Sequence, residues 1–446
     1  MTHNRWSLPL AVTALCLLVL FLIAFMTGQR GIPVEDGGEF LTVARLGGIN
    51  HPPGLPLLSL WSRLSWILFG SEGLRVIFAV AAASAFILIT RKRNISTLVF
   101  LGGILLLPSV AGRLLIWDAY GFLFLIYAVA YFRKPPFGLE AGFLLGLALA
   151  IHPQGIFLAV LFEFKRSSIP QFFCGLLLGL SLYLALPVYS ASGAIVDWGS
   201  TGTVGNFIRQ VTAGGYREVY GGRMWGISYH VLLRHLGVLW NIIWPVLLLP
   251  LIAGVVRLFR SNRKLLIRLE ILLVLDLLFV TIINPMAAGT TQTAILSLFA
   301  ILVFAVMGMN AIYDWRRIAG VIAAGAVLAG GVLQWEPLPD QRNEIVEYFA
   351  PAPFESVFYL SNNDLLYGGW VLKYAEDRRP DIVLLSTGNF SIWFERMATW
   401  FNPDVDLSKG VLDVGDFSMS RDELARRLIN ATIQDNPGRQ FFTDFR

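Results

Sequence analysis

The sequence predicts a polytopic α-helical membrane protein with a C-terminal α/β domain outside the cytoplasm. Of its 446 residues, 56% are hydrophobic and only 15% are charged, and runs of about 20 apolar residues, the length that a bilayer core requires, recur along it. Residues 1–335 carry 24 basic and 12 acidic side chains, a net charge of +12, whereas residues 336–446 carry 11 and 18, a net charge of −7. Because the basic excess lies in membrane loops, it does not indicate nucleic-acid binding.

Nine apolar runs are long enough to predict spanning helices. They comprise residues 8–26, 74–90, 95–112, 115–132, 170–189, 236–258, 266–283, 293–313 and 318–333. No small-residue cleavage site follows the first run, which predicts a retained anchor and not a signal peptide. Placing the basic clusters between the runs on the same side as Arg5 satisfies the positive-inside rule and puts the N-terminus in the cytoplasm.

Residues 137–164 do not fit a simple count of spans. Both flanks are basic, yet the segment has only about 28 residues, where two full crossings need about 40. His152-Pro153-Gln154-Gly155 lies near its middle and predicts a re-entrant pair of short helices that meet there, giving about 11 membrane helices in all. One long helix kinked at Pro153 is the alternative.

The first external segment, residues 27–72, carries the candidate catalytic acids. A helix from Asp36 through Leu46 would place Asp36 and Glu39 on one face. Closely spaced carboxylates beside apolar walls acquire different proton affinities, so one of them can act as a general base. The alternative is that Glu35 and Asp36 only stabilise the start of a helix. Tryptophans within residues 55–69 place the following helix at the headgroup level.

The C-terminal residues 336–446 predict a small α/β domain. Residues 357–360 and 382–385 have the pattern of buried strands, and residues 364–376 that of a helix between them. Residues 441–442 predict another strand, and residues 423–429 a helix that opens with a capping box. No glycine-rich phosphate loop follows the first strand. We expect this domain to bind the acceptor or to brace the second external loop, residues 190–235.

Several motifs resemble those of one family. They are Pro33-Val34-Glu35-Asp36-Gly37-Gly38-Glu39-Phe40, His51-Pro52-Pro53-Gly54, Trp117-Asp118-Ala119-Tyr120, Gly146-Leu147-Ala148-Leu149 with His152, Tyr183-Leu184-Ala185-Leu186-Pro187, Asp197-Trp198-Gly199, Asn363-Asp364 and Arg379-Pro380-Asp381. In this order, over most of the chain, they are similar to GT-C-type membrane glycosyltransferases, whose eukaryotic branch contains the protein O-mannosyltransferases.

The resemblance implies sugar transfer from a polyprenyl-phosphate carrier, with the catalytic acid in the first external loop. Onto this sequence Asp36 carries over directly, with Glu39 beside it. Two departures leave the identity of the donor open: Asp118 stands where the family more often has Glu, and Pro153-Gln154 follows His152 in place of a second polar pair.

The chemistry of sugar transfer needs a base and an anion site. A carboxylate can accept the proton of the acceptor hydroxyl and stabilise positive charge on the sugar, while cationic or hydrogen-bonding groups hold the departing phosphate. The candidate substrate-binding residues are His51, Arg113, Asp118, His152, Arg217 and Arg223, with Arg209 as a further arginine. Alternatively, the arginines anchor to lipid headgroups, His51 caps the Pro-Pro turn, and His152 satisfies backbone groups. No metal or cofactor is predicted.

We therefore expect a GT-C-type glycosyltransferase in a bacterial inner membrane, with the C-terminal domain extracytoplasmic. Its partners would be membrane lipid, the lipid-linked sugar donor, with mannose as one candidate, and a protein or glycan acceptor. A transporter or flippase of lipid-linked sugars is the alternative, and the intramembrane Asp276 would suit it, but transporters usually have two comparable halves, which this sequence lacks. A non-catalytic scaffold is a third hypothesis. We expect Asp276 to be a structural hydrogen-bonding partner.

Overall fold

The computed structural model describes residues 10–90, 95–133, 137–214, 229–243, 245–283, 294–386, 426, 429–430, 433–434 and 436–443. This part of the chain is predominantly helical. Four helical stretches in it are long and apolar enough to cross a membrane, or up to six if two bent helix pairs each count as one span. The four are Pro56–Ile89, Arg166–Ala191, Ile295–Trp315 and Arg317–Gln334. The chain is thus a helical protein with several helices suited to a bilayer, and the count of about 11 stays a prediction.

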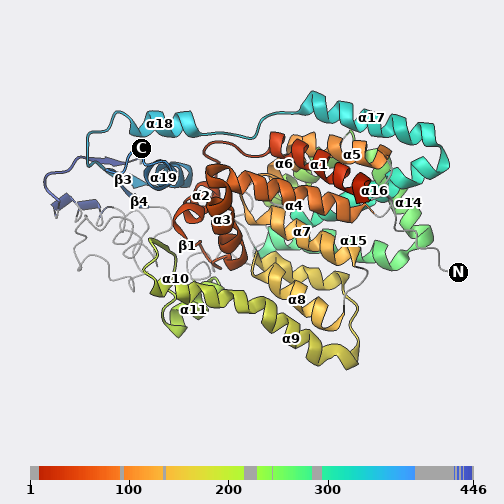
Figure 1. Ribbon diagram of the computed structural model, residues 1–446, viewed down its shortest axis with the longest axis horizontal. Coiled ribbons are helices and arrows are strands. Elements are labelled where there is room, and N and C mark those ends of the chain that lie inside the picture. The colour runs from red at the N-terminus through yellow and green to blue at the C-terminus, as the bar shows by residue number, and fades with distance from the viewer. Residues whose placement is uncertain are drawn as a thin grey trace. The chain divides into compact units, whose positions relative to one another are not determined.

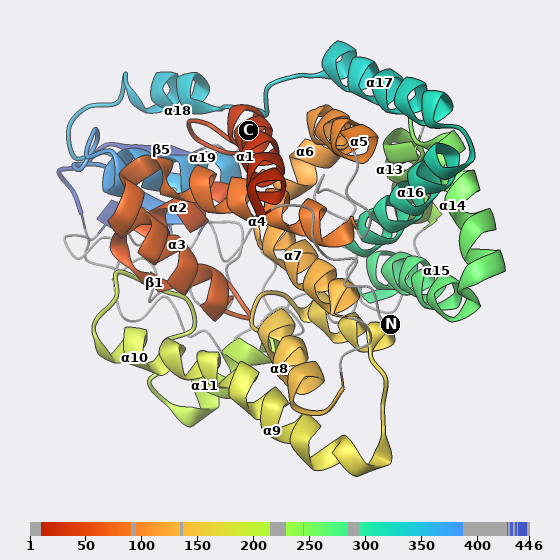
Figure 2. The same cartoon turned by 45° about the vertical axis from the view of Figure 1, so that its right-hand side comes forward.

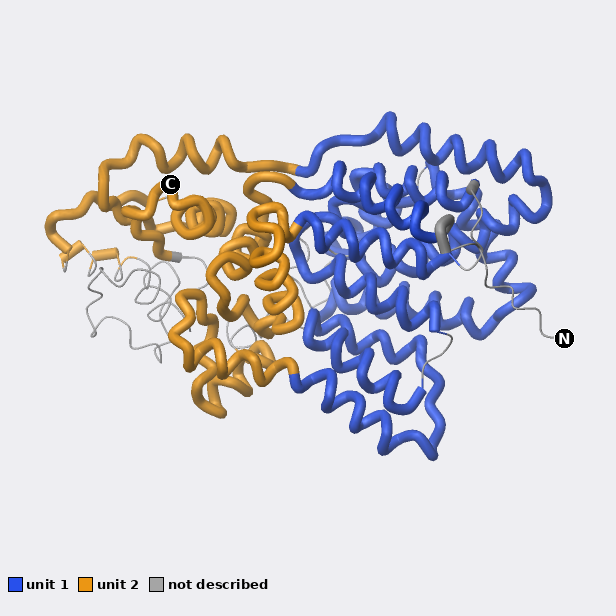
Figure 3. The backbone as a smooth tube through the Cα atoms, viewed as in Figure 1, with its two compact units in different colours: residues 1–29, 75–181, 223–338 blue, residues 30–74, 182–222, 339–446 orange. Residues whose placement is uncertain are grey.

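The chain forms two compact units, coloured separately in Figure 3. Unit 1 comprises residues 1–29, 75–181 and 223–338, and unit 2 comprises residues 30–74, 182–222 and 339–446. Unit 2 therefore combines the first external segment with the C-terminal residues. The division into domains 1–335 and 336–446 stays a prediction.

Unit 1 is built of helices (Figure 1). They are α1 (Leu10–Thr27), α4 (Gly73–Ile89), α5 (Ile95–Leu106), α6 (Pro108–Leu114), α7 (Ala119–Phe132), α8 (Gly138–Leu149), η2 (Pro153–Leu161), α9 (Ile169–Leu180), α13 (Tyr229–Ile243), α14 (Leu248–Ser261), α15 (Arg263–Leu278), α16 (Ile295–Trp315) and α17 (Arg317–Gln334). Most of α16 is buried, and it packs against α14, α15 and α17, so α16 lies in the core of this unit.

Two segments expected as single helices are bent. Residues 95–112 form α5 and α6, which meet at 81°, because Leu107 is extended and Pro108 can neither donate a backbone hydrogen bond nor follow a helical residue without a clash. Residues 236–258 fall on α13 and α14, which meet at 95°. Hydropathy detects the apolar length of a segment but not such a change of direction.

The segment 137–164 forms two short helical pieces, as the sequence predicts. The helix α8 ends at Leu149, and η2 begins at Pro153 directly after His152. A side chain on Gly155 would collide with the backbone of Ala148, so η2 folds back against α8. This arrangement excludes one long kinked helix.

Facing glycines bring α8 and α9, side by side in Figure 2, into close contact. Gly142 and Gly146 on α8 face Gly175 and Gly179 on α9, and a Cβ atom on Gly146 would lie 2.7 Å from the Cα atom of Gly179. Small residues four positions apart let two backbones approach, which strengthens van der Waals packing between helices in a membrane.

Unit 2 combines helices with two small parallel sheets. Its elements are α2 (Gly37–Leu46), β1 (Gly48–Ile49), α3 (Pro56–Phe69), α10 (Ala185–Ala191), β2 (Val196–Asp197), α11 (Val204–Val211), α18 (Arg342–Phe349), β3 (Val357–Leu360), α19 (Asn363–Trp370), η7 (Val371–Ala375), β4 (Val383–Ser386) and β5 (Phe441–Thr443). Strand β1 pairs with β2, and the other sheet has the order β4-β3-β5. The three C-terminal strands and the helix between the first two are confirmed, whereas the predicted helix 423–429 lies outside the described residues.

Helix α3 has the opposite polarity to a helix of a water-soluble protein. Its serines Ser59, Ser62 and Ser65 are buried, whereas Ile67 and Leu68 are 64% and 62% exposed. An apolar surface of this kind is stable when it faces lipid. Helix α3 also belongs to the apolar stretch Pro56–Ile89, which is long enough to cross a membrane, so the headgroup-level position of residues 55–69 stays a prediction.

The glycine contact between α8 and α9 predicts a local sensitivity to side-chain size. Gly146→Leu should destabilise unit 1 by about 1–3 kcal/mol through overpacking and lower the thermal midpoint by roughly 2–10 °C, measured by fluorescence-detected size-exclusion chromatography after heating. Gly325→Leu on α17 is the control, because a Cβ atom there has no neighbour within 4 Å. Equal thermal midpoints for the two variants would contradict this account of the packing.

Candidate active site

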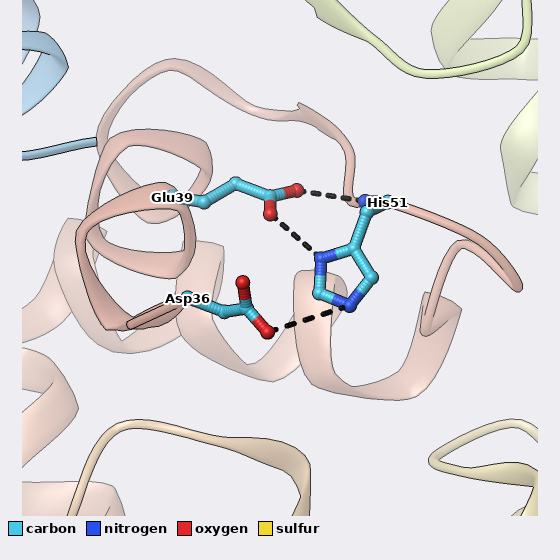
Figure 4. Close-up of side chains that lie close together, drawn as sticks. All are labelled: Asp36, Glu39 and His51. Carbon is cyan, nitrogen blue, oxygen red and sulfur yellow. Dashed lines mark hydrogen bonds and ion pairs between the residues drawn. The ribbon is translucent and has the colours of Figure 1, made fainter. Parts of the chain in front are cut away.

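Asp36, Glu39 and His51 converge at one place in unit 2 (Figure 4). Asp36 stands at the start of α2, Glu39 lies in the first turn of this helix, and His51 follows β1. The sequence predicted the pair of acids on one helix face, and proposed His51 only as a phosphate ligand or as the cap of a turn.

Apolar side chains and a glycine define α2. Phe40, Val43 and Ala44 are buried, at a spacing that places them on one side of a helix. The helix ends at Gly47, whose φ of 75° suits glycine and whose N–H group donates to the carbonyl of Val43 at 2.8 Å. Asp36 stands at the N-cap of α2 but accepts no capping hydrogen bond through its side chain, so any stabilisation that it gives to the start of the helix comes from its charge.

A short strand and a turn position His51. Strand β1 pairs with β2 in parallel, with Ile49 in register with Asp197. The turn after it is closed by the N–H group of Gly54, which donates to the carbonyl of His51 at 2.8 Å. The imidazole lies between the rings of Phe40 and Trp198, with centroid separations of 5.7 Å and 6.3 Å. These contacts fix the ring beside α2.

Glu39 is fully buried and bonded to His51 twice. Its Oε1 atom accepts from the backbone N–H group of His51 at 2.7 Å, and its Oε2 atom lies 2.7 Å from Nδ1 of the ring. The side chain is 0% exposed. Burial raises the pKa of Glu39, and the neighbouring His51 partly offsets that rise.

Asp36 occupies a different environment from Glu39. Its side chain is 36% exposed, and its Oδ2 atom lies 3.9 Å from Nε2 of His51. The carboxylate of Glu39 is therefore buried and in hydrogen-bond contact with the imidazole, whereas the carboxylate of Asp36 lies near the imidazole and is partly exposed. Such a difference of environment separates the roles of two acids in one site.

By distance alone, these three residues could hold a metal ion, because one ligand atom from each lies within 4.8 Å of the others. The hydrogen bonds favour another arrangement. Nδ1 of His51 and Oε2 of Glu39 are 2.7 Å apart, whereas a tetrahedral ion bound to both at about 2.1 Å would hold them about 3.4 Å apart. The sequence-based expectation of no metal stays a prediction.

The C-terminal segment of unit 2 supports the start of α2. The Oδ1 atom of Asp340 accepts from the backbone N–H group of Ile32 at 2.9 Å, and Asp364 on α19 accepts from the N–H group of Glu35. Gly38 packs on Tyr367, and a Cβ atom there would lie 2.9 Å from the Tyr367 backbone. The sequence predicted that this segment braces the second external loop or binds the acceptor, and these contacts with the first loop are a finding that it did not foresee.

Among the other predicted substrate-binding residues, Arg113, Asp118 and His152 belong to unit 1, and Arg209 lies in the last turn of α11 in unit 2. Asp118 accepts from the N–H group of Ala119 at the start of α7. His152 accepts from the N–H group of Gln154 at 3.2 Å, which agrees with the alternative that it satisfies backbone groups. Arg113 is buried on α6. Arg217 and Arg223 lie outside the described residues.

Asp276 is a buried hydrogen-bonding partner, as expected. It accepts from the side chain of Gln154 at 3.2 Å and from the N–H group of Ser297, near the start of α16, at 3.0 Å. His235 on α13 lies 4.0 Å from it. Sequence analysis missed His235, whose signal was a histidine at the edge of an apolar run.

Comparison with protein-family models and with curated proteins found no match for this chain. The GT-C resemblance therefore rests on the motifs of the sequence.

The buried charge of Glu39 predicts a pH-dependent stability. Because its pKa is raised in the folded protein, folding is favoured when Glu39 is protonated, and that stabilisation is lost as pH rises from its ordinary pKa through the raised one. Glu39→Gln keeps the size and one acceptor but carries no charge. Between pH 5 and pH 8, the thermal midpoint of the variant should exceed that of the wild type most at pH 8, and this difference should shrink toward pH 5. A difference that grows on acidification would contradict the assigned direction.

Proposed function

We propose that the protein is a glycosyltransferase that moves a sugar from a polyprenyl-phosphate donor to an extracytoplasmic acceptor, with Asp36 as the general base. The observation that carries this proposal is the half-exposed carboxylate of Asp36 beside the buried Glu39–His51 pair. A base that must meet a substrate has to be accessible, and the residues that orient it are best held in the interior.

The reaction needs one proton acceptor and one stable leaving group. Asp36 takes the proton of the acceptor hydroxyl while the oxygen forms a bond to the anomeric carbon. The bond from that carbon to the phosphate oxygen breaks, and its electron pair leaves with the polyprenyl phosphate. The negative charge of Asp36 also stabilises the positive charge that develops on the sugar.

The surroundings of the site suit a lipid-linked donor. Helix α2, which carries the acids, packs against α3, and the outward side of α3 is apolar, with Trp61, Ile67, Leu68 and Phe69 between 47% and 64% exposed. A helix of this polarity lies in the lipid interface, where the sugar of a polyprenyl phosphate is held. This geometry supports a donor that arrives through the membrane.

The proposed function also requires a particular topology in the membrane. We place the N-terminus in the cytoplasm and the residues of unit 2 outside it, with about 11 membrane helices that include the α8–η2 re-entrant pair. A bacterial inner membrane is the proposed location. The acceptor would be a protein or a glycan.

A transporter of lipid-linked sugars is the second candidate. It is favoured by the polar cluster of Gln154, His235 and Asp276, which is buried among apolar helices, because ionisable groups at such positions often line transport paths. Asp276→Asn separates the two functions. In proteoliposomes with a fluorescent polyprenyl-phosphate sugar, a transporter should lose flipping, whereas a transferase that stays folded should keep sugar transfer.

Asp36→Asn should lower sugar transfer by at least about 100-fold, the range of contributions found for general bases. The measurement is the loss of label from a panel of radiolabelled polyprenyl-phosphate sugars, with purified full-length protein. Asp377→Asn is the matched control, because Asp377 is an exposed partner of Arg45 in the same unit. Full activity of Asp36→Asn would refute the proposed role.

A further inference from the structure

The hydrogen bonds of Glu39 assign the orientation of the His51 imidazole. When Glu39 is ionised it can only accept at Oε2, and the 2.7 Å contact then places a proton on Nδ1 of His51. The second bond, from the backbone N–H group of His51 to Oε1, keeps the carboxylate from turning away. In the neutral ring, Nε2 then carries a lone pair and acts as a proton acceptor.

That acceptor atom faces the proposed base. Nε2 of His51 lies 3.9 Å from Oδ2 of Asp36, and Figure 4 shows the ring facing both carboxylates, with one nitrogen toward Glu39 and the other toward Asp36. The separation is longer than a direct hydrogen bond, and one intervening water molecule or a small rotation of Asp36 closes it. Glu39, His51 and Asp36 thus form one compact group, in which Glu39 is buried and Asp36 is partly exposed.

We propose that Glu39 and His51 are positioning residues that withdraw from Asp36 the proton it takes from the acceptor hydroxyl. This inference rests on the proposed function of Asp36 and adds two residues to it. Neither residue touches the sugar, and both act through the carboxylate of Asp36.

The proton balance of the step is complete. After the acceptor O–H bond breaks, the proton is bound to Oδ2 of Asp36, and it then moves to Nε2 of His51. The imidazolium that forms is stabilised by the charge of Glu39 across the Nδ1 hydrogen bond. His51, whose side chain is 16% exposed, releases the proton to water, which returns Asp36 and His51 to their starting states.

Within the described residues, the elements packed against α2 and β1 carry further charged and titratable groups. They are Arg63 on α3, Tyr189 on α10, Asp197 on β2, Asp364 and Tyr367 on α19, and Lys373 and Tyr374 on η7. Arg63 donates to the carbonyl of Ala44 at 3.3 Å, Asp364 accepts from the N–H group of Glu35, and Lys373 donates to the carbonyl of Ile382 at 2.6 Å. Among the described residues, Asp36 and Glu39 are the carboxylates paired with His51.

The relay predicts a particular pH dependence. His51 can accept a proton only while it is neutral, so activity should fall at low pH as the ring becomes protonated. The charge of Glu39 favours the protonated ring, and Glu39→Gln removes that charge. The acid limb of the pH–rate profile should therefore move to lower pH in Glu39→Gln, while the plateau of kcat falls roughly 10- to 100-fold, as for loss of a charged hydrogen-bond partner.

The experiment measures kcat and KM from pH 5 to pH 9 for the full-length protein and its variants. The probe is polyprenyl phosphate-[14C]mannose, or the sugar of the donor panel that the wild type accepts. The variants are Glu39→Gln, His51→Gln and the double variant, with His230→Gln on the exposed part of α13 as the control. We expect lower kcat with little change in KM, and a double variant no slower than the slower single one, because the two residues act as a unit.

Each other outcome overturns a defined part of the account. An unshifted acid limb in Glu39→Gln, or multiplicative losses in the double variant, would overturn the relay while the transferase function stands. If EDTA abolishes activity and Mn²⁺ restores it, the site holds a metal ion at the same atoms and the relay is wrong. If the wild type transfers no sugar from any donor, the proposed function fails, and the relay fails with it. Glu39→Gln, which keeps the side-chain shape, carries the test if His51→Gln does not fold.

Discussion

The hydrogen-bonded contact between Glu39 and His51 is the constraint on which the candidate site depends. A carboxylate with no exposed surface is costly unless hydrogen-bond donors replace the water it has lost, and here the backbone N–H group of His51 donates to Oε1 of Glu39, while Nδ1 of the ring lies 2.7 Å from Oε2. For both contacts to exist, α2 and the chain after β1 must keep one relative position. The pairing of β1 with β2, the packing of Gly38 on Tyr367 and the closed turn at Gly54 all maintain that position.

The two units differ in how their helices place small, polar and apolar side chains. In unit 1, glycines such as Gly146 and Gly179 stand at the contact of two helices. They let the two backbones approach closely, and in a membrane the resulting van der Waals packing replaces the hydrophobic effect that drives helices together in water. In unit 2, α3 turns its serines inward and its large apolar side chains outward. Both features are compatible with a helical membrane protein, and α2, which begins beside Asp36 and carries Glu39, packs against α3.

Local patterns in the sequence were sufficient for several elements. Alternation and hydrophobicity predicted the strands β3, β4 and β5, and Pro153 predicted the break after α8. Pro108 lies within an unbroken apolar run, so hydropathy concealed the 81° bend that it causes. For the same reason, His235 passed unnoticed beside its apolar neighbours. In both cases one residue carried the information, and the strongly apolar average of the surrounding segment hid it.

The candidate site was predictable only where neighbours in the sequence are also neighbours in space. Asp36 and Glu39 lie one helical turn apart, so their shared face follows from helix geometry. The placement of His51 depends on β1 pairing with residues near 196, and the support of Glu35 by Asp364 joins positions 329 apart. No periodicity encodes such contacts, because they depend on how distant segments pack.

The support of α2 by the last quarter of the chain also bears on how the protein is made. The ribosome synthesises residues 31–46 early, but Asp340, Asp364 and Tyr367, which hold that segment in place, are translated about 300 positions later. Until residue 367 has been translated, the nascent polypeptide lacks these supports. Assembly of the group formed by Asp36, Glu39 and His51 is thereby delayed until most of the chain has been synthesised.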